Sequence, residues 1–156
     1  MKIIADLNAG ELLVQGAVFP ISCNVRTLRD GTRLGKDVVK TIPDGLPYDP
    51  RPFPKGTWRV TGIEWQKDKK FDPNTFGPVK IRTDAWQMVW VWELDGQGRY
   101  LRQTARQVRD SGYLLHYAVS GTTWGCIRLN SPEDATAVAN IISGVLSREE
   151  VLLEAV

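Results

Sequence analysis

The chain carries a single histidine, His116, ten residues before Cys126, which is one of its two cysteines. A cysteine attacks a carbonyl carbon as the thiolate, so the reaction needs a base for the thiol proton and donors for the oxyanion. Imidazole has the side-chain pKa nearest neutrality, and a neighbouring imidazole lowers the pKa of a thiol. The pair predicts acyl transfer by a cysteine nucleophile, provided that the fold brings the two side chains together.

The segment between the two residues suits a link between neighbouring strands. Residues 117–125 are rich in small and turn-prone residues, and Gly125 allows the backbone to approach closely just before the cysteine. If His116 and Cys126 end adjacent strands, their side chains can face each other, and the amides around Gly125 and Cys126 can donate to an oxyanion. Arg128 would then lie on the same strand face as Cys126.

A second interpretation stays open on spacing alone. A histidine and a cysteine ten residues apart can be unrelated core and surface residues. Residues 125–129, Gly-Cys-Ile-Arg-Leu, also suit a buried strand with a small apolar thiol. Cys23 has no histidine near it in the sequence, and we expect it to be a structural strand residue.

Residues 123–129, Thr-Trp-Gly-Cys-Ile-Arg-Leu, resemble the signature of the YkuD-type L,D-transpeptidases. In that family a Ser or Thr stands three residues before the catalytic cysteine, and Gly-Cys-Ile/Val-Arg follows. Other segments resemble family motifs in the same order: Phe53–Val60, Phe76-Gly77 with Ile81, Leu115-His116 and Asp134-Ala135. The resemblance covers about residues 10–145. The short spacing from histidine to cysteine resembles a compact branch of the family that includes type VI secretion effectors.

The resemblance implies a role for each residue of the site. Cys126 is expected to be the nucleophile and His116 the base, with the backbone carbonyl of Tyr117 orienting the imidazole in the place of a carboxylate. Gly125 completes the expected catalytic set.

Arg128, Thr123 and Trp124 are the expected substrate-binding residues. Arg128 would either help to hold the site or bind a substrate carboxylate. The implied substrate is the peptidoglycan stem, cleaved between meso-diaminopimelate and D-alanine of the tetrapeptide. D-Alanine leaves, a thioester forms at the cysteine, and an amine or water resolves it.

Three functions remain open at this point. An amine acceptor makes the protein an L,D-transpeptidase and water makes it an L,D-carboxypeptidase, and the choice depends on the shape of the cleft. A non-catalytic cell-wall or glycan-binding β-domain would use the tryptophans and keep the cysteine for packing. The order of histidine before cysteine argues against NlpC/P60-type hydrolases, and sortase-like enzymes have the histidine much further upstream.

The patterning predicts a mainly β, single-domain protein over residues 1–156, with the L,D-transpeptidase sandwich or barrel that the resemblance implies. Alternating apolar residues indicate strands at 3–7, 12–15, 18–25, 57–64, 79–83, 86–94 and 113–119. Residues 99–109 fit either a returning strand or a short helix, and a Pro-rich loop spans 30–56. After Cys126, capping residues and apolar spacing predict a helix at 132–145 and a second, shorter one from Ser147.

Four of the six tryptophans lie between residues 65 and 92. Alternation places Trp86, Met88, Trp90, Trp92 and Leu94 on one strand face. That face can belong to the core, bind glycan, or form part of a lid over the site within an 86–109 hairpin. The Pro-rich segment 43–56 is a candidate second wall of the same cleft.

Composition narrows the class of partner. Twenty basic against eighteen acidic residues leave a net charge of +2 without a basic run, so we expect no nucleic acid. One histidine and two widely separated cysteines predict neither a structural metal site nor a cofactor. We expect no membrane span and no classical signal peptide, and hence a mature form or a non-classical delivery to the periplasm or cell wall.

Overall fold

The computed structural model describes residues 1–25, 47–48, 50–97, 99–121 and 123–156. The strands are β1 (Lys2–Asp6), β2 (Glu11–Val14), β3 (Ala17–Ser22), β4 (Gly56–Trp65), β5 (Val79–Thr83), β6 (Trp86–Leu94), β7 (Tyr100–Ser111), β8 (Leu114–Tyr117), β9 (Ile127–Leu129) and β10 (Leu152–Ala155). The helices are α1 (Gln66–Lys69), α2 (Pro73–Phe76) and α3 (Pro132–Leu146). Residues 30–46 and residue 49 of the predicted Pro-rich loop lie outside the described part of the chain.

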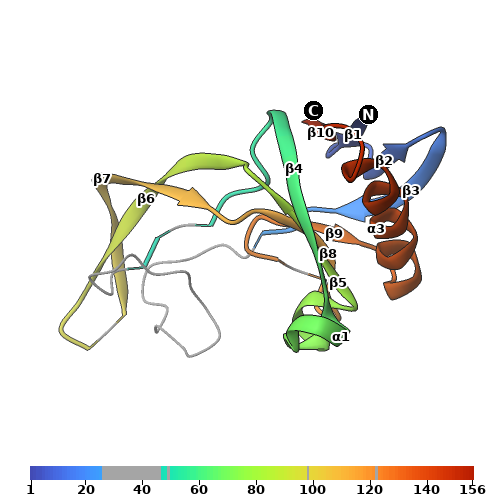
Figure 1. Ribbon diagram of the computed structural model, residues 1–156. Helices are drawn as coiled ribbons and strands as arrows, with labels where there is room; N and C mark the ends of the chain where they lie inside the picture. The colour runs from blue at the N-terminus through green and yellow to red at the C-terminus, as the bar shows by residue number, and fades with distance from the viewer. Residues whose placement is uncertain (26–46, 49, 98, 122) are drawn as a thin grey trace.

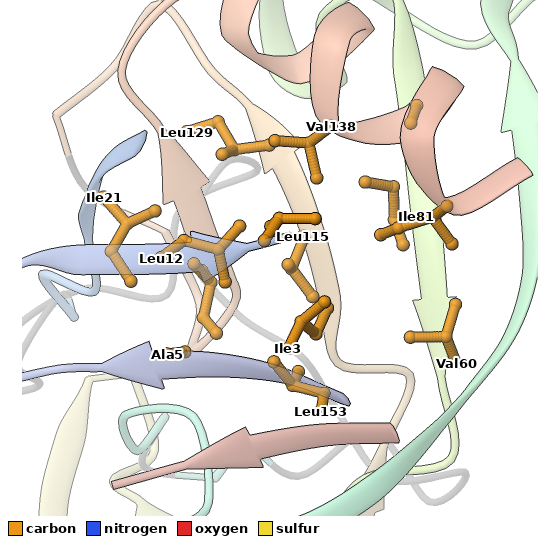
Figure 2. Packing of buried hydrophobic residues seen from close by; sticks show 14 of the residues in the cluster. Ile3, Ala5, Leu12, Ile21, Val60, Ile81, Leu115, Leu129, Val138 and Leu153 are labelled. Carbon is orange, nitrogen blue, oxygen red and sulfur yellow. The ribbon is translucent and has the colours of Figure 1, made fainter. Parts of the chain in front are cut away.

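A closed barrel holds all the described strands except β6 and β7, in the order β1-β10-β4-β5-β8-β9-β3-β2. Alternate residues of each strand point inward because successive side chains of a strand face opposite sides. Ile3, Leu12, Ile81 and Leu153 are among the fully buried side chains that meet inside the barrel (Figure 2). The expectation of a mainly β fold is confirmed.

Helix α3 packs its apolar face against the same core (Figures 1 and 2). It begins where the sequence predicts, because the Ser131 hydroxyl accepts a hydrogen bond from the Asp134 amide at 3.0 Å and Pro132 takes the first helical position. Val138 and Ile142, one turn apart, are fully buried. The helix that follows Cys126 is therefore confirmed.

The predicted second helix from Ser147 is wrong. The chain turns there and continues as β10, which pairs parallel with β1 and antiparallel with β4. Leu153 and Ala155 are buried, whereas Leu152 and Glu154 are half-buried, which is the alternation of a strand. Strand β10 fills the position between β1 and β4 in the barrel, and this long-range pairing outweighs the local capping chemistry.

The segment 66–78 contains the single-turn helices α1 and α2. Helix α2 is capped by Asp72, whose carboxylate accepts hydrogen bonds from the Asn74 amide at 3.0 Å and the Thr75 hydroxyl at 2.7 Å. Helix α2 contacts β8, the strand that contains His116.

Strands β6 and β7 form a separate two-stranded sheet that extends away from the barrel in Figure 1. Residues 99–109 are thus a strand. The base of this hairpin is fastened by buried hydrogen bonds, since the hydroxyls of Tyr48 and Tyr113 each donate to Asp110 at 2.7 Å. The Gln87 amide donates to the Tyr113 hydroxyl at 2.8 Å and to the carbonyl of Pro52 at 2.7 Å.

The tryptophans of the expected single face differ in burial. A register shift lies after Trp90, which pairs with Gln107, because Trp92 pairs with Gln103 and the extra residues belong to β7. Trp92 is buried, whereas Trp86 remains 40% exposed. The guanidinium of Arg109 covers the Trp86 ring, 4.4 Å from its centroid.

None of the described helices is long and apolar enough to cross a membrane.

Replacing Leu153 by alanine is predicted to lower the free energy of unfolding by about 2–5 kcal/mol, because the side chain is fully buried and its removal leaves a cavity. The matched change Leu13→Ala, at a leucine that is 40% exposed, is predicted to cost less than about 1 kcal/mol. Chemical denaturation of both variants measures the difference. Equal losses would contradict the barrel core described above.

Candidate active site

The pairing of β8 places His116 and Cys126 on one face of the sheet. Strand β8 runs parallel to β9, with Leu115 opposite Ile127 and His116 opposite Arg128. Leu115 and Ile127 are fully buried in the barrel, so His116 and Arg128 point to the outer face. Cys126 stands two residues before Arg128 and shares this face, which makes it a diagonal neighbour of His116.

Both side chains line a single cavity of about 650 Å³ on the outside of the barrel. The cavity extends between α2, β5, β8 and the segment before β9. Its lining residues are Asn74, Thr75, Phe76, Lys80, Arg82, Gly112, Leu114, His116, Ala118, Val119, Ser120, Thr123, Trp124 and Cys126. Among the described residues, no group of three His, Cys, Asp or Glu side chains could hold a metal ion.

The imidazole of His116 is held in one tautomer. Its Nδ1 lies 2.8 Å from the carbonyl oxygen of Tyr117, and because a carbonyl only accepts hydrogen bonds, Nδ1 carries the hydrogen. In the neutral ring Nε2 then has the lone pair. The geometry places the Tyr117 carbonyl in the position that the resemblance predicts.

Burial favours the neutral form of this imidazole. His116 is only 4% exposed, and burial lowers its pKa below the ordinary value of 6.5. The backbone of Tyr117 and of Thr75 raises the pKa, but the cationic Lys80 and Arg128 lower it. A neutral imidazole is the form that can accept a proton.

The Cys126 thiol lies at the edge of the cavity, 7% exposed, and forms no disulfide. Its sulfur accepts a hydrogen bond from the Leu114 amide at 3.4 Å. A donor aimed at sulfur favours the thiolate over the thiol, since hydrogen bonding to a charged form stabilises it. The Thr123 hydroxyl donates to the Cys126 carbonyl at 2.7 Å and so fixes the backbone of the cysteine.

Gly125 has a φ of +106°, which L side chains rarely adopt. A Cβ at this position would overlap the carbonyl oxygen of Arg51 and would lie 2.7 Å from the Tyr113 ring. The Cys23 thiol donates to the Gly125 carbonyl at 3.4 Å and accepts from the Phe53 amide at 3.2 Å. Cys23 follows the end of β3 and does not line the cavity, so it stabilises the turn before Cys126 through these two hydrogen bonds.

The expected substrate-binding residues separate into two groups. Thr123 and Trp124 line the cavity. Arg128 is not among the lining residues: its Nε donates to the Ala118 carbonyl at 2.7 Å, and its guanidinium lies 5.1 Å from the centre of the Tyr117 ring. Of the two expected roles for Arg128, the placement favours holding the site over binding substrate.

Comparison with known proteins identifies the family. The family model of the YkuD L,D-transpeptidase catalytic domain matches residues 18–147. The chain belongs to this family. Among solved structures, L,D-transpeptidase 1 of Mycobacterium tuberculosis is similar at 18% identity with a TM-score of 0.44, covering 99% of this chain. This chain spans 58% of the length of that protein, and no curated protein gives a match. The extension of the domain to all of residues 1–156, and membership of the compact branch, stay predictions.

Three contributors to the site of this L,D-transpeptidase domain were missed from the sequence. Lys80 and Thr75 line the cavity, and the Leu114 amide contacts the sulfur. Lys80 had a signal, because it alternates with buried Val79 and Ile81 and must therefore face outward. A backbone amide and a residue of a one-turn helix leave no comparable pattern.

The tryptophan hairpin and the Pro-rich segment were expected to border the site. Among the described residues, none from 86–109 and none from 43–56 lines the cavity. The hairpin approaches it only through Gly112, which directly follows β7. Whether the hairpin closes over the site as a lid stays a prediction.

Gly125→Ala is predicted to destabilise the protein by at least about 1–3 kcal/mol, because the new Cβ forces the strained backbone away from Arg51. It should also slow alkylation of Cys126 by iodoacetamide. Gly121→Ala is the matched control, since a Cβ there meets nothing within 4 Å. Denaturation and peptide mapping check both variants. A Gly125→Ala protein with parental stability would contradict the described turn.

The pKa of His116 is predicted to lie below 6.5. Because the chain has one histidine, its imidazole proton signal can be followed by NMR without ambiguity, and Cys126→Ser removes the influence of the thiolate. The folded protein binds this proton less tightly than the unfolded chain, so stability from His116 is present above pH 6.5 and is lost as the pH falls through the lower folded pKa. A titration midpoint at or above 6.5 would contradict the buried, cation-flanked environment.

Proposed function

We propose that this L,D-transpeptidase domain cleaves the bond between meso-diaminopimelate and D-alanine in peptidoglycan tetrapeptide stems, through a thioester at Cys126. The observation that carries the proposal is the shared cavity of His116 and Cys126, with Nδ1 of the imidazole engaged by the Tyr117 carbonyl. Family membership supports the same reaction class.

In the first half-reaction, Nε2 of His116 takes the proton of the Cys126 thiol. The thiolate attacks the carbonyl carbon of diaminopimelate, and a C–S bond forms. The negative charge passes to the carbonyl oxygen, for which the backbone N–H groups at Gly125 and Cys126 are the proposed donors. The intermediate collapses as the C–N bond breaks, and the imidazolium gives its proton to the nitrogen of the leaving D-alanine.

In the second half-reaction an acceptor amine attacks the thioester carbonyl. His116 accepts a proton from the amine, and the thiolate leaves as the new amide bond forms. The proton then returns to sulfur, which restores the thiol and the neutral imidazole. Because the two half-reactions need the same base, the neutral state of His116 serves both.

The neighbouring groups have positioning roles in this scheme. Thr123 holds the backbone carbonyl of Cys126, and the Leu114 amide contacts its sulfur. Trp124 and Phe76 provide apolar walls for the stem peptide, and Asn74 provides a polar one. The proposed place of action is the periplasm or cell wall, where such stems occur.

The reaction is tested by mass spectrometry of disaccharide-tetrapeptide incubated with the protein and an added D-amino acid. We expect loss of alanine and incorporation of the D-amino acid. Cys126→Ala should abolish both, because no nucleophile remains. His116→Gln should lower the rate by about 10²–10⁴-fold, because the base is lost.

The control is Cys23→Ser, which removes the other thiol but keeps a group able to accept from Phe53 and donate to Gly125. It should retain turnover. Alanine loss without incorporation identifies water as the acceptor and an L,D-carboxypeptidase. Stem binding without alanine loss, or turnover that survives Cys126→Ala, would overturn the proposal, and binding alone would favour a wall-binding domain.

A further inference from the structure

Lys80 occupies a defined place in the wall of the cavity. It stands on the outer face of β5, where it pairs in register with His116 on β8 and with Glu64 on β4. The cavity that contains His116 and Cys126 is lined by Lys80 as well. A cationic side chain therefore lies beside the two residues proposed to carry out the reaction.

Two aromatic rings hold the ammonium group of Lys80. Its Nζ lies 3.9 Å from the centre of the Phe76 ring and 4.5 Å from that of Phe71. The two rings meet edge to face, with their centres 5.8 Å apart, and Phe76 also lies 5.3 Å from the His116 ring. These cation–π contacts hold the ammonium group in a preferred position before any ligand arrives.

The other cation of the cavity is neutralised. Arg82 forms a two-pronged pair with Glu64, from Nε to Oε1 at 2.8 Å and from Nη2 to Oε2 at 2.9 Å. Lys80 forms no ion pair with a carboxylate of the described residues. Partial burial is the main cause that lowers the pKa of Lys80, while the charge of Glu64, which is already paired with Arg82, raises it.

We propose that Lys80 binds a carboxylate group of the stem peptide and so positions the scissile carbonyl at Cys126. This inference rests on the proposed function. A tetrapeptide stem offers two carboxylates near its scissile bond, on the terminal D-alanine and on the side chain of diaminopimelate. Either one would give the ammonium group a direct anionic partner through a charge-assisted hydrogen bond in the cavity.

A competing role for Lys80 is to stabilise the Cys126 thiolate without contacting substrate. The two groups do interact, since the negative charge of Cys126 raises the pKa of Lys80. That role predicts a general loss of thiol reactivity when the charge is removed. Anion binding instead predicts a loss that depends on the charge of the reagent or substrate, so the two roles are separable.

The first experiment compares alkylation of Cys126 by iodoacetate, which carries a carboxylate, with that by neutral iodoacetamide. Lys80→Met, which keeps the apolar stem, should lower the iodoacetate rate relative to the iodoacetamide rate by about 10-fold, and Lys80→Arg should preserve the ratio. Lys67→Met removes the same charge from α1, outside the cavity lining, and should leave the ratio unchanged. Equal loss with both reagents would overturn the proposal in favour of thiolate stabilisation.

The second experiment uses tetrapeptides in which one carboxylate at a time is converted to the amide. Lys80→Met should raise KM for the unmodified peptide by about 10–100-fold, with kcat changed less. Amidation of the carboxylate that Lys80 binds should raise KM for the parent protein by a similar factor. With that peptide the parent and Lys80→Met should have the same KM, which identifies the carboxylate that is bound. If neither amidation removes the effect of Lys80→Met, the proposal is wrong.

The two experiments separate failure of the inference from failure of the proposed function. Alkylation requires only a reactive Cys126 and no peptide turnover. If the ratio of the iodoacetate rate to the iodoacetamide rate depends on Lys80 but the protein cleaves no tetrapeptide, the anion site is supported and the proposed reaction is wrong. If tetrapeptide turnover is normal but that ratio does not depend on Lys80, the reaction is supported and the anion site is wrong.

Discussion

The parallel pairing of β8 with β9 is the constraint on which the site depends. One step of register would turn His116 into the barrel and Leu115 outward, because successive side chains of a strand face opposite sides. The pairing is maintained by the core, where Leu115 and Ile127 are fully buried. The same contacts that stabilise the barrel therefore set the relative position of the imidazole and the thiol.

Burial then gives the pair its chemical character. Burial, together with the charges of Lys80 and Arg128, lowers the pKa of the imidazole, and the Tyr117 carbonyl engages Nδ1, so the lone pair of the neutral ring is on Nε2. The charge of Lys80, which lowers the pKa of His116, also interacts with Cys126. A backbone carbonyl, and not a carboxylate, orients the histidine.

Much of the fold could be predicted from the sequence because its signals are local. Alternation marks strands such as Val79–Thr83, and Ser131 with Pro132 marks the start of α3. The features that failed depend on distant residues. Strand β10 exists because β1 and β4 need a partner between them, and the register shift after Trp90 arises from how β7 pairs with β6.

The residues of the site divide in the same way, into those with a local signal in the sequence and those whose placement depends on distant residues. His116 and Cys126 could be found from residue type, spacing and resemblance, and the Tyr117 carbonyl from resemblance alone. Arg128 was assigned two roles because sequence does not show that the Ala118 carbonyl lies within its reach. Lys80 could not be placed, since its meeting with His116, 36 residues further along the chain, requires that β5 and β8 become neighbours.

Rapid-quench intact-mass spectrometry of the protein with tetrapeptide stem reports directly on whether Cys126 becomes acylated. We expect a transient adduct with the mass of the stem without its terminal alanine, located on Cys126 by peptide mapping and labile to hydroxylamine as a thioester is. Turnover of the stem without such an adduct, or with the adduct on Cys23, would rule out Cys126 as the nucleophile.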